Sequence, residues 1–152
     1  MRIAIGTDHA GFELKQRLVA ELRALGHEVI DEGTHSTEPV DYPDFCFPVG
    51  EKVARGEVDF GIVLGGSGIG ESIAANKVAG VRASVVTSDE TARLTRLHND
   101  SNVIALGART NGGHEGPSRW VRIWLETAFE GGRHAPRLEK IRRYEAAHGR
   151  TL

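Results

Sequence analysis

The sequence has a single cysteine and no long apolar run, and both scarcities narrow the class of protein that it encodes. A lone cysteine, Cys46, cannot form a disulfide within the chain, and such a composition is typical of a reducing compartment. No apolar stretch approaches the roughly 20 residues that a membrane-spanning helix needs. The opening residues are too poor in apolar side chains for a signal peptide. We therefore expect a soluble, cytoplasmic protein with no membrane partner.

An excess of charge of one sign is also missing. The chain carries 19 Lys and Arg against 21 Asp and Glu, a net charge of −2, which gives no general basis for binding nucleic acid. Its 7 histidines show no metal-ligand spacing such as His-Glu-x-x-His, so we expect no metal. The length of 152 residues is that of one domain, spanning 1–152 and large enough to bury a core.

Short apolar segments alternate with helical patterns along the chain. The predicted strands cover residues 2–6, 28–31, 60–64, 81–86 and 103–106. A predicted helix follows each strand, and a last, basic helix covers about 134–147 after the glycine pair 131–132. Alternation of this kind predicts an α/β fold whose sheet is all parallel and covered by helices on both faces.

Local signals set several helix boundaries. Pro48 lies inside the second predicted helix and should kink it or delay its start. Residues 87–90 have the spacing of a capping box, Thr-Ser-Asp-Glu, at the start of the fourth helix. The fifth helix should begin at residues 116–117 and carry apolar side chains as far as Phe129. These boundaries complete the predicted order of elements.

A glycine-rich loop, residues 65–70, follows the third predicted strand and precedes a helix that begins at Glu71. Backbone N–H groups in such a loop can approach an anion, and the helix N-terminus adds partial positive charge. Known glycine motifs do not fit, because Glu71 stands where a P-loop requires Lys and where the dinucleotide motif requires Gly. Ile69 stands where the nucleophile elbow requires Gly. The loop is therefore either an anion cradle beside an acid, or a tight turn whose Glu71 only complements the helix dipole.

In open parallel sheets, ligands bind outside the carboxyl ends of the strands. We expect the polar side chains in the loops around these ends to meet at one edge of the sheet. They are Asp8, His9, Tyr42, Ser67, Glu71, His98, Asn99 and Arg109. Structural alternatives exist, because Asp8 can form a turn, Tyr42 can pack in the core, and His98 can complement the end of its helix.

Arg133 and Arg137 are four residues apart, so they share one face of a helix if both are helical. On that face they either bind a phosphate or are simply solvated.

A carboxylate beside fixed N–H donors suits removal of a proton from carbon, because the donors stabilise the enediolate that forms. The inventory therefore favours an aldose–ketose isomerase acting on a phosphorylated sugar. A non-catalytic sugar-phosphate or nucleotide-binding module on the same fold is the alternative, which the presence of both Asp8 and Glu71 disfavours.

Several short motifs occur in order along nearly the whole chain. They are Gly-Thr-Asp-His-Ala-Gly (6–11), Asp-Tyr-Pro (41–43), Gly-Gly-Ser-Gly-Ile-Gly-Glu (65–71), Ala-Ala-Asn-Lys (74–77), His-Asn-Asp (98–100) and Gly-Gly-Arg-His (131–134). This set resembles the family of ribose-5-phosphate isomerase B, which also includes subunits of galactose-6-phosphate isomerase. The resemblance implies a Rossmann-like, three-layer α/β/α fold with a five-stranded parallel sheet and an extra C-terminal helix. It also implies no cofactor and a homodimer with sites shared between subunits, and it leaves a tetramer open.

The resemblance further implies a role for each candidate residue. Basic side chains are expected to bind the phosphate, and they are His9, Arg109, Arg133 and Arg137. Opening of the sugar ring falls to His98 with Asp8. Groups that can donate to an enediolate are Ser67, Asn99 and the loop residues Gly66, Gly68, Ile69 and Gly70, with Tyr42 also in contact with substrate. Relatives act on tetrose, pentose and hexose phosphates with these motifs, so a sugar shorter or longer than ribose 5-phosphate stays open.

One position departs from many members of that family. They have a cysteine base directly after the third strand, where this chain has Gly65, whereas a branch that resembles the mycobacterial enzymes uses a glutamate that matches Glu71. We therefore predict that Glu71, and not Cys46, removes the carbon-bound proton. We also expect the helix N-terminus to keep Glu71 ionised at neutral pH.

Overall fold

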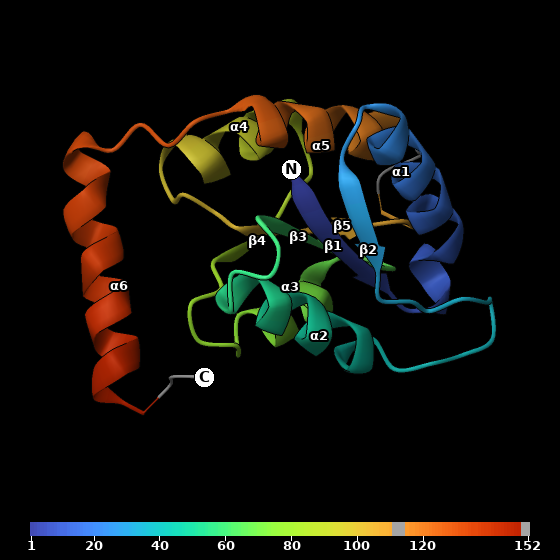
Figure 1. The fold of residues 1–152 in the computed structure, drawn as a ribbon, viewed down its shortest axis with the longest axis horizontal. Helices are drawn as coiled ribbons and strands as arrows, with labels where there is room; N and C mark the ends of the chain where they lie inside the picture. The colour runs from blue at the N-terminus through green and yellow to red at the C-terminus, as the bar shows by residue number, and fades with distance from the viewer. Residues whose placement is uncertain (111–114, 150–152) are drawn as a thin grey trace.

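In this computed structural model, the described residues, 1–110 and 115–149, form a five-stranded parallel sheet with helices on both faces (Figure 1). The strands are β1 (Arg2–Thr7), β2 (Glu28–Asp31), β3 (Phe60–Gly65), β4 (Ala83–Val85) and β5 (Val103–Gly107), in the sheet order β2-β1-β3-β5-β4. The helices are α1 (Phe12–Ala24), α2 (Pro43–Ala54), α3 (Ile69–Ala75), α4 (Asp89–Leu97), α5 (Glu115–Glu126) and α6 (Ala135–Ala147), with short 3-10 turns η1 (His9–Gly11) and η2 (Gly132–His134). The predicted three-layer α/β/α fold with its extra C-terminal helix is confirmed.

Alternation of side chains along the strands divides the core into two layers. On one face, Ile3 and Ile62 pack among apolar side chains of α1, α4 and α5. On the other face, Ala4 and Val63 pack against α2 and α3. Figure 1 shows the same division, with α1, α4 and α5 along one side of the sheet and α2 and α3 along the other. Because both faces are covered, the side chains available for chemistry lie at the two ends of the strands.

The C-terminal helix α6 stands apart from both layers (Figure 1). None of the 13 described residues of α6 is buried. Its apolar side chains Ile141 and Tyr144 are 48% and 60% exposed. A hydrogen bond from the N–H of Gly80 to Glu145 Oε2, 3.2 Å long, connects it to the rest of the chain. A helix that leaves apolar side chains in solvent is expected to have another surface to pack on.

Three predicted helix starts differ from the structure, and one of them is α3, which begins at Ile69 and not at Glu71. The cap of α4 is Ser88, which exchanges hydrogen bonds with Thr91, so the capping box begins one residue later than predicted. Ser88 has the extended backbone that a cap needs, with φ −159° and ψ 166°. The second helix begins at Pro43, so Pro48 does not delay its start. Proline at the first turn is tolerated because its missing N–H has no helical partner there.

The fifth helix is shorter than predicted. It ends at Glu126, so Phe129 lies beyond it in the segment that leads to η2. Thr127 Oγ1 donates to the carbonyl of Ile123 at 2.6 Å, which satisfies one of the last carbonyls of the helix. Of the helices within residues 1–110 and 115–149, none has the length and apolar character needed to cross a membrane.

Candidate active site

The predicted site residues, together with His134, form two clusters, which we name by the end of the strands at which they lie. The carboxyl-edge cluster follows β1, β3 and β5 or borders those loops, and its members are Asp8, His9, Tyr42, Ser67, Glu71 and Arg109. The amino-edge cluster lies at the end of α4 and in η2 and the start of α6, and its members are His98, Asn99, Arg133, His134 and Arg137.

The prediction that His98 and Asn99 join the carboxyl edge within one chain is wrong. In a parallel sheet each connecting helix returns the chain to the edge where the next strand begins. His98 caps the C-terminus of α4, and β5 begins only at Val103. Since β5 has 5 residues, it separates the two edges by roughly 13 Å at about 3.3 Å per residue. One chain therefore does not bring the two clusters together.

Glu71 is the buried acid of the carboxyl edge. It lies in the first turn of α3, is only 3% exposed, and its Oε2 has no hydrogen-bond partner among the described residues. The carboxylate packs directly over Gly65 at the end of β3, and a side chain added at Gly65 would collide with Glu71 Oε1. The carboxylate thus occupies the space that a side chain directly after β3 would fill.

Burial has the largest effect on the pKa of Glu71. Burial raises the pKa of its carboxyl above the ordinary value, and the nearby charge of Asp8 raises it further. The backbone N–H groups of Glu71 and Gly68 act in the opposite direction but do not cancel this shift. Desolvation therefore raises the pKa of Glu71 more than the helix N-terminus lowers it, and the ionisation of Glu71 at neutral pH stays a prediction.

Asp8 and His9 are fixed at the start of η1. Asp8 is 8% exposed, and its Oδ1 accepts a hydrogen bond from the N–H of Ala10 at 2.9 Å. His9 Nδ1 accepts a hydrogen bond from the N–H of Val40 at 3.1 Å. When neutral, His9 must then carry its proton on Nε2, so that it presents an N–H donor to a ligand.

The glycine loop is held in place by close backbone packing. Gly68 has φ +81°, and a Cβ there would lie 3.0 Å from the backbone of Leu106 in β5, so both its conformation and its surroundings require glycine. Ser67 Oγ accepts a hydrogen bond from the N–H of Ile69 at 3.2 Å. The Ile69 N–H is therefore already engaged, whereas its side chain is 58% exposed.

Arg109 and Tyr42 border this loop from two sides. The N–H of Arg109 donates to the carbonyl of Gly66 at 2.9 Å, and its side chain passes close to the Gly66 Cα. The ring of Tyr42 packs against Gly70, where a Cβ would lie 2.7 Å from its hydroxyl oxygen. The structure thus brings together the loop, Glu71, Tyr42 and Arg109, as the sequence predicted for the carboxyl edge.

The thiol of Cys46 is close to the same carboxylates, but it is not prepared for chemistry. Cys46 is fully buried, and burial, followed by the charges of Glu71 and Asp8, raises its pKa to about 12. A thiol with so high a pKa stays protonated at neutral pH and is a poor base or nucleophile.

The centre of the amino-edge cluster is a pair of histidines. The rings of His98 and His134 stack with centroids 4.3 Å apart. Glu130 Oε2 lies 3.4 Å from His134 Nε2 and 4.0 Å from His98 Nε2. Arg133 and Arg137 are exposed, but their charges act on His134, whose pKa is lowered first by burial and then by these neighbours and His98.

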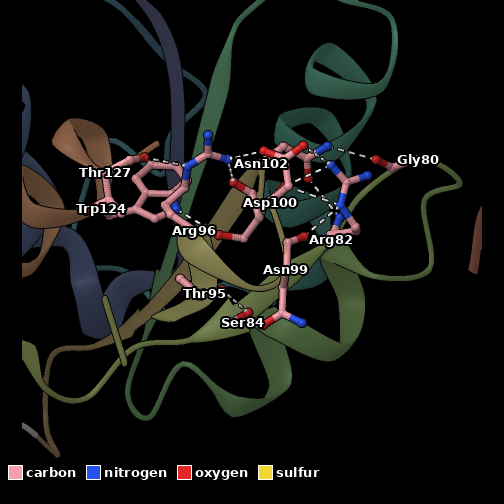
Figure 2. A network of polar contacts seen from close by, with 11 residues as sticks. Gly80, Arg82, Ser84, Thr95, Arg96, Asn99, Asp100, Asn102, Trp124 and Thr127 are labelled. Carbon is pink, nitrogen blue, oxygen red and sulfur yellow. Dashed lines mark hydrogen bonds and ion pairs between the residues drawn. The ribbon is translucent and has the colours of Figure 1, made fainter. Parts of the chain in front are cut away.

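A network of polar contacts fixes the loop that carries His98 and Asn99 (Figure 2). Arg96 Nη1 donates to Asp100 Oδ1 at 2.7 Å, and Arg82 Nη2 donates to the Asp100 carbonyl at 2.8 Å. Asp100 has φ +45°, a conformation that costs a non-glycine residue free energy and needs such support. The Asn99 carbonyl accepts from Arg82 Nε at 3.1 Å, while its side chain points away from the network (Figure 2).

Sequence reasoning missed Glu130 and the two arginines of this network. The i,i+4 spacing of Glu130 and His134 was a usable signal, because it places an acid beside a histidine when the intervening turn is tight. Arg96 had the same i,i+4 signal, because it lies four residues before Asp100. Arg82 had no local signal, since the fold brings it to Asp100 from across the turn after α4.

Comparisons with known proteins match this geometry to one family. The model of the Ribose/Galactose Isomerase family matches residues 3–141. The chain belongs to this family. The resemblance seen in the sequence motifs is therefore confirmed.

Relatives of this Ribose/Galactose Isomerase chain are similar over nearly their whole length. Ribose-5-phosphate isomerase B of Escherichia coli (strain K12) is 51% identical over 140 residues, which cover 92% of this chain and 93% of that protein. The structure of Clostridium thermocellum ribose-5-phosphate isomerase B superposes with a TM-score of 0.94 at 50% identity, covering 97% of this chain and 99% of that one. The enzyme of Mycoplasma genitalium, solved with bound ribulose-5-phosphate, gives a TM-score of 0.91 at 40% identity, covering 95% and 96%.

Proposed function

We propose that the protein is an aldose–ketose isomerase that interconverts ribose 5-phosphate and ribulose 5-phosphate without a cofactor. Its family supports the reaction class, and the relatives named above support the pentose phosphate. The observation that carries the mechanism is the Glu71 carboxylate, which is buried at the carboxyl edge with one oxygen lacking a hydrogen-bond partner among the described residues. Such a group can accept a proton without first breaking a hydrogen bond.

Glu71 is the proposed base. It removes the proton from C2 of the open-chain aldose and returns it to C1, while a proton passes from the C2 oxygen to the C1 oxygen. Its raised pKa makes it a stronger base than an exposed carboxylate. Ser67 and the N–H groups of Gly66, Gly68 and Gly70 are proposed to stabilise the enediolate oxygen.

The proposed site needs residues of two chains. His98, with Asp8, is the proposed catalyst of ring opening, and Asn99 is a further enediolate donor, yet both lie on the amino edge of their own chain. We propose a homodimer in which the amino-edge cluster of one protomer faces the carboxyl-edge cluster of its partner. The separation of the clusters by the length of β5 and the unburied α6 both support this arrangement. A tetramer would be a pair of such dimers.

Basic side chains of both clusters are proposed to bind the phosphate. His9 and Arg109 come from the carboxyl-edge cluster, and Arg133 and Arg137 come from the amino-edge cluster. Guanidinium groups suit this role because they match the geometry of phosphate oxygens. Tyr42, which lies against the loop at Gly70, is proposed to border the sugar. The location is proposed to be cytoplasmic, where the free thiol of Cys46 would stay reduced.

An isomerase assay tests the function. We expect faster turnover of ribose 5-phosphate than of erythrose 4-phosphate or hexose 6-phosphates, measured as kcat/KM with each sugar. A preference for one of the other sugars would reassign the substrate. Binding of all of them without turnover would instead identify a non-catalytic sugar-phosphate-binding module. Sedimentation of the active protein tests the assembly, and an active monomer at assay concentration would contradict the shared site.

A further inference from the structure

The amino-edge cluster contains a group of potential metal ligands, of which only His98 has a proposed role in isomerisation. His98, Glu130 and His134 each offer one ligand atom, and these atoms all lie within 4.8 Å of one another. Two imidazole nitrogens and a carboxylate oxygen form a donor set that suits Zn²⁺ and related divalent ions. Around a tetrahedral zinc ion, ligand atoms lie roughly 3.3–3.5 Å apart. The 3.4 Å between Glu130 Oε2 and His134 Nε2 already matches this spacing.

His134 provides an independent sign that a partner is expected here. It is only 4% exposed, yet its Nε2 has no hydrogen-bond partner among the described residues. Glu130 Oε2 lies 3.4 Å away, but the two atoms do not form a hydrogen bond. A buried polar nitrogen without a partner normally costs free energy, and a bound cation would satisfy its lone pair.

The three ligands are positioned by separate backbone contacts. The N–H of Glu130 donates to the carbonyl of Leu97, one residue before His98, at 3.1 Å. The N–H of His134 donates to the carbonyl of Gly131 at 3.1 Å, and the positive φ of Gly131, +71°, lets the chain turn back between Glu130 and His134. The end of α4 and η2 are thereby held against each other before any ion binds.

We propose that His98, Glu130 and His134 bind a divalent transition-metal ion, with Zn²⁺ as the best fit and water in the fourth position. Coordination requires the ring of His98 to turn out of its stack with His134, because a metal lies in the plane of each imidazole that binds it. His98 is free to do so, since its side chain is 35% exposed. The charges of Arg133 and Arg137 oppose a cation, and the carboxylate of Glu130 offsets one of these two charges.

Zinc binding would also change turnover. This effect rests on the proposed role of His98 in isomerisation, whereas the binding itself does not. A histidine that coordinates zinc has no free nitrogen lone pair for proton transfer to the sugar oxygen. Zinc would then act as a reversible inhibitor that EDTA removes, while the metal-free enzyme stays active. The site would connect isomerase activity to the availability of free zinc.

Titration calorimetry of the untagged, EDTA-treated protein with ZnCl₂ tests the site. We expect one ion per chain. Replacing one ligand, in Glu130→Gln or His134→Gln, should weaken zinc binding by at least tenfold to a hundredfold. A loss of this size already follows when a residue that only hydrogen-bonds to a metal ligand is changed. The matched control is His148→Gln, which removes an exposed histidine at the end of α6 and should leave affinity unchanged. Substitution with Co²⁺ should give the visible absorption of a four-coordinate ion in the wild type and lose it in Glu130→Gln.

Two outcomes would overturn the proposed site. One is the absence of zinc binding at zinc concentrations up to those of the sugar phosphate in the isomerase assay. The other is zinc binding that survives both Glu130→Gln and His134→Gln but is lost in His148→Gln. Neither outcome affects the isomerase proposal, which the sugar assay tests separately. Zinc binding that needs His98 as well as Glu130 and His134 but leaves turnover unchanged would keep the metal site and would exclude His98 from ring opening.

Discussion

The two edges of the sheet differ in nearly every physical respect. The carboxyl-edge cluster stands on strand ends and a glycine loop, and its acids Asp8 and Glu71 are 8% and 3% exposed. The amino-edge cluster stands on a helix end and a 3-10 turn, and its arginines Arg133 and Arg137 are exposed. One edge is built to hold a carboxylate away from water, and the other presents cations and histidines to an incoming anion. Neither is complete for isomerisation, which is why we assign one half of each proposed site to each protomer.

The largest effect should follow removal of the base from the carboxyl-edge cluster. Glu71→Gln keeps the shape of the side chain but cannot accept the proton, so kcat should fall by roughly 10²–10⁴ while substrate still binds. The measurement is kcat with ribose 5-phosphate, together with the affinity for a phosphorylated inhibitor.

Cys46→Ala is the matched control for this change. The thiol lies near Glu71 and is protonated at neutral pH, so the variant should stay active. Near-normal turnover by Glu71→Gln, or a folded but inactive Cys46→Ala, would transfer the role of base away from Glu71.

The second largest effect should come from mixing two inactive variants, one from each cluster. In a heterodimer of Glu71→Gln and His98→Asn chains, one shared site carries both substitutions and the other carries neither. Random assortment should therefore restore about a quarter of the wild-type rate after the two proteins are denatured and refolded together. Refolding each variant alone is the control. If all residues of a site came from one chain, no activity would return, and a site shared between the two protomers would be excluded.

The carboxyl edge was largely predictable from the sequence, whereas the amino edge was not. Glu71 and the loop before it are adjacent in sequence, so the order strand, glycine loop and helix already placed the acid beside the N–H groups. His98 was assigned to the wrong edge because its motif says nothing about the direction in which α4 runs. That direction follows from the parallel pairing of β4 with β5, which requires α4 to return the chain to the edge where β5 begins. The burial that raises the pKa of Glu71 also depends on tertiary packing around Gly65, which no local pattern records.

A smaller effect is expected from the residues of the amino edge that we propose to bind the phosphate. Arg137→Ala removes a charge-assisted contact that is present in both ground and transition states, so KM should rise roughly tenfold to a hundredfold with little change in kcat. Arg143→Ala is the matched control on the same helix, because Arg143 already pairs with Glu139 at 2.9 Å. Unchanged affinity of Arg137→Ala for a phosphorylated inhibitor would remove α6 from the site.

The smallest expected effect is on stability, and it compares one acid from each edge. The pKa of Glu71 in the folded chain lies above its ordinary value of 4.5, so folding favours the protonated carboxyl. The stability that this proton contributes is present below pH 4.5 and is lost as pH rises through the folded pKa. At pH 8 the wild type must bury the charged form, whereas Glu71→Gln buries a neutral amide.

We therefore expect Glu71→Gln to be more stable than the wild type at pH 8, with a smaller difference at pH 4, where the wild-type carboxyl is protonated to a greater extent. Urea unfolding at both pH values and at one protein concentration measures it, because unfolding of a dimer depends on concentration. Glu130→Gln is the control from the amino edge. The Glu130 side chain is 56% exposed, so this change should not stabilise the protein at pH 8 as removal of a buried charge does. A stability gain for Glu71→Gln that is equal at pH 4 and pH 8 would mean that the gain does not come from the buried charge. Burial of Glu71 at the carboxyl edge would then no longer explain the raised pKa of its carboxyl.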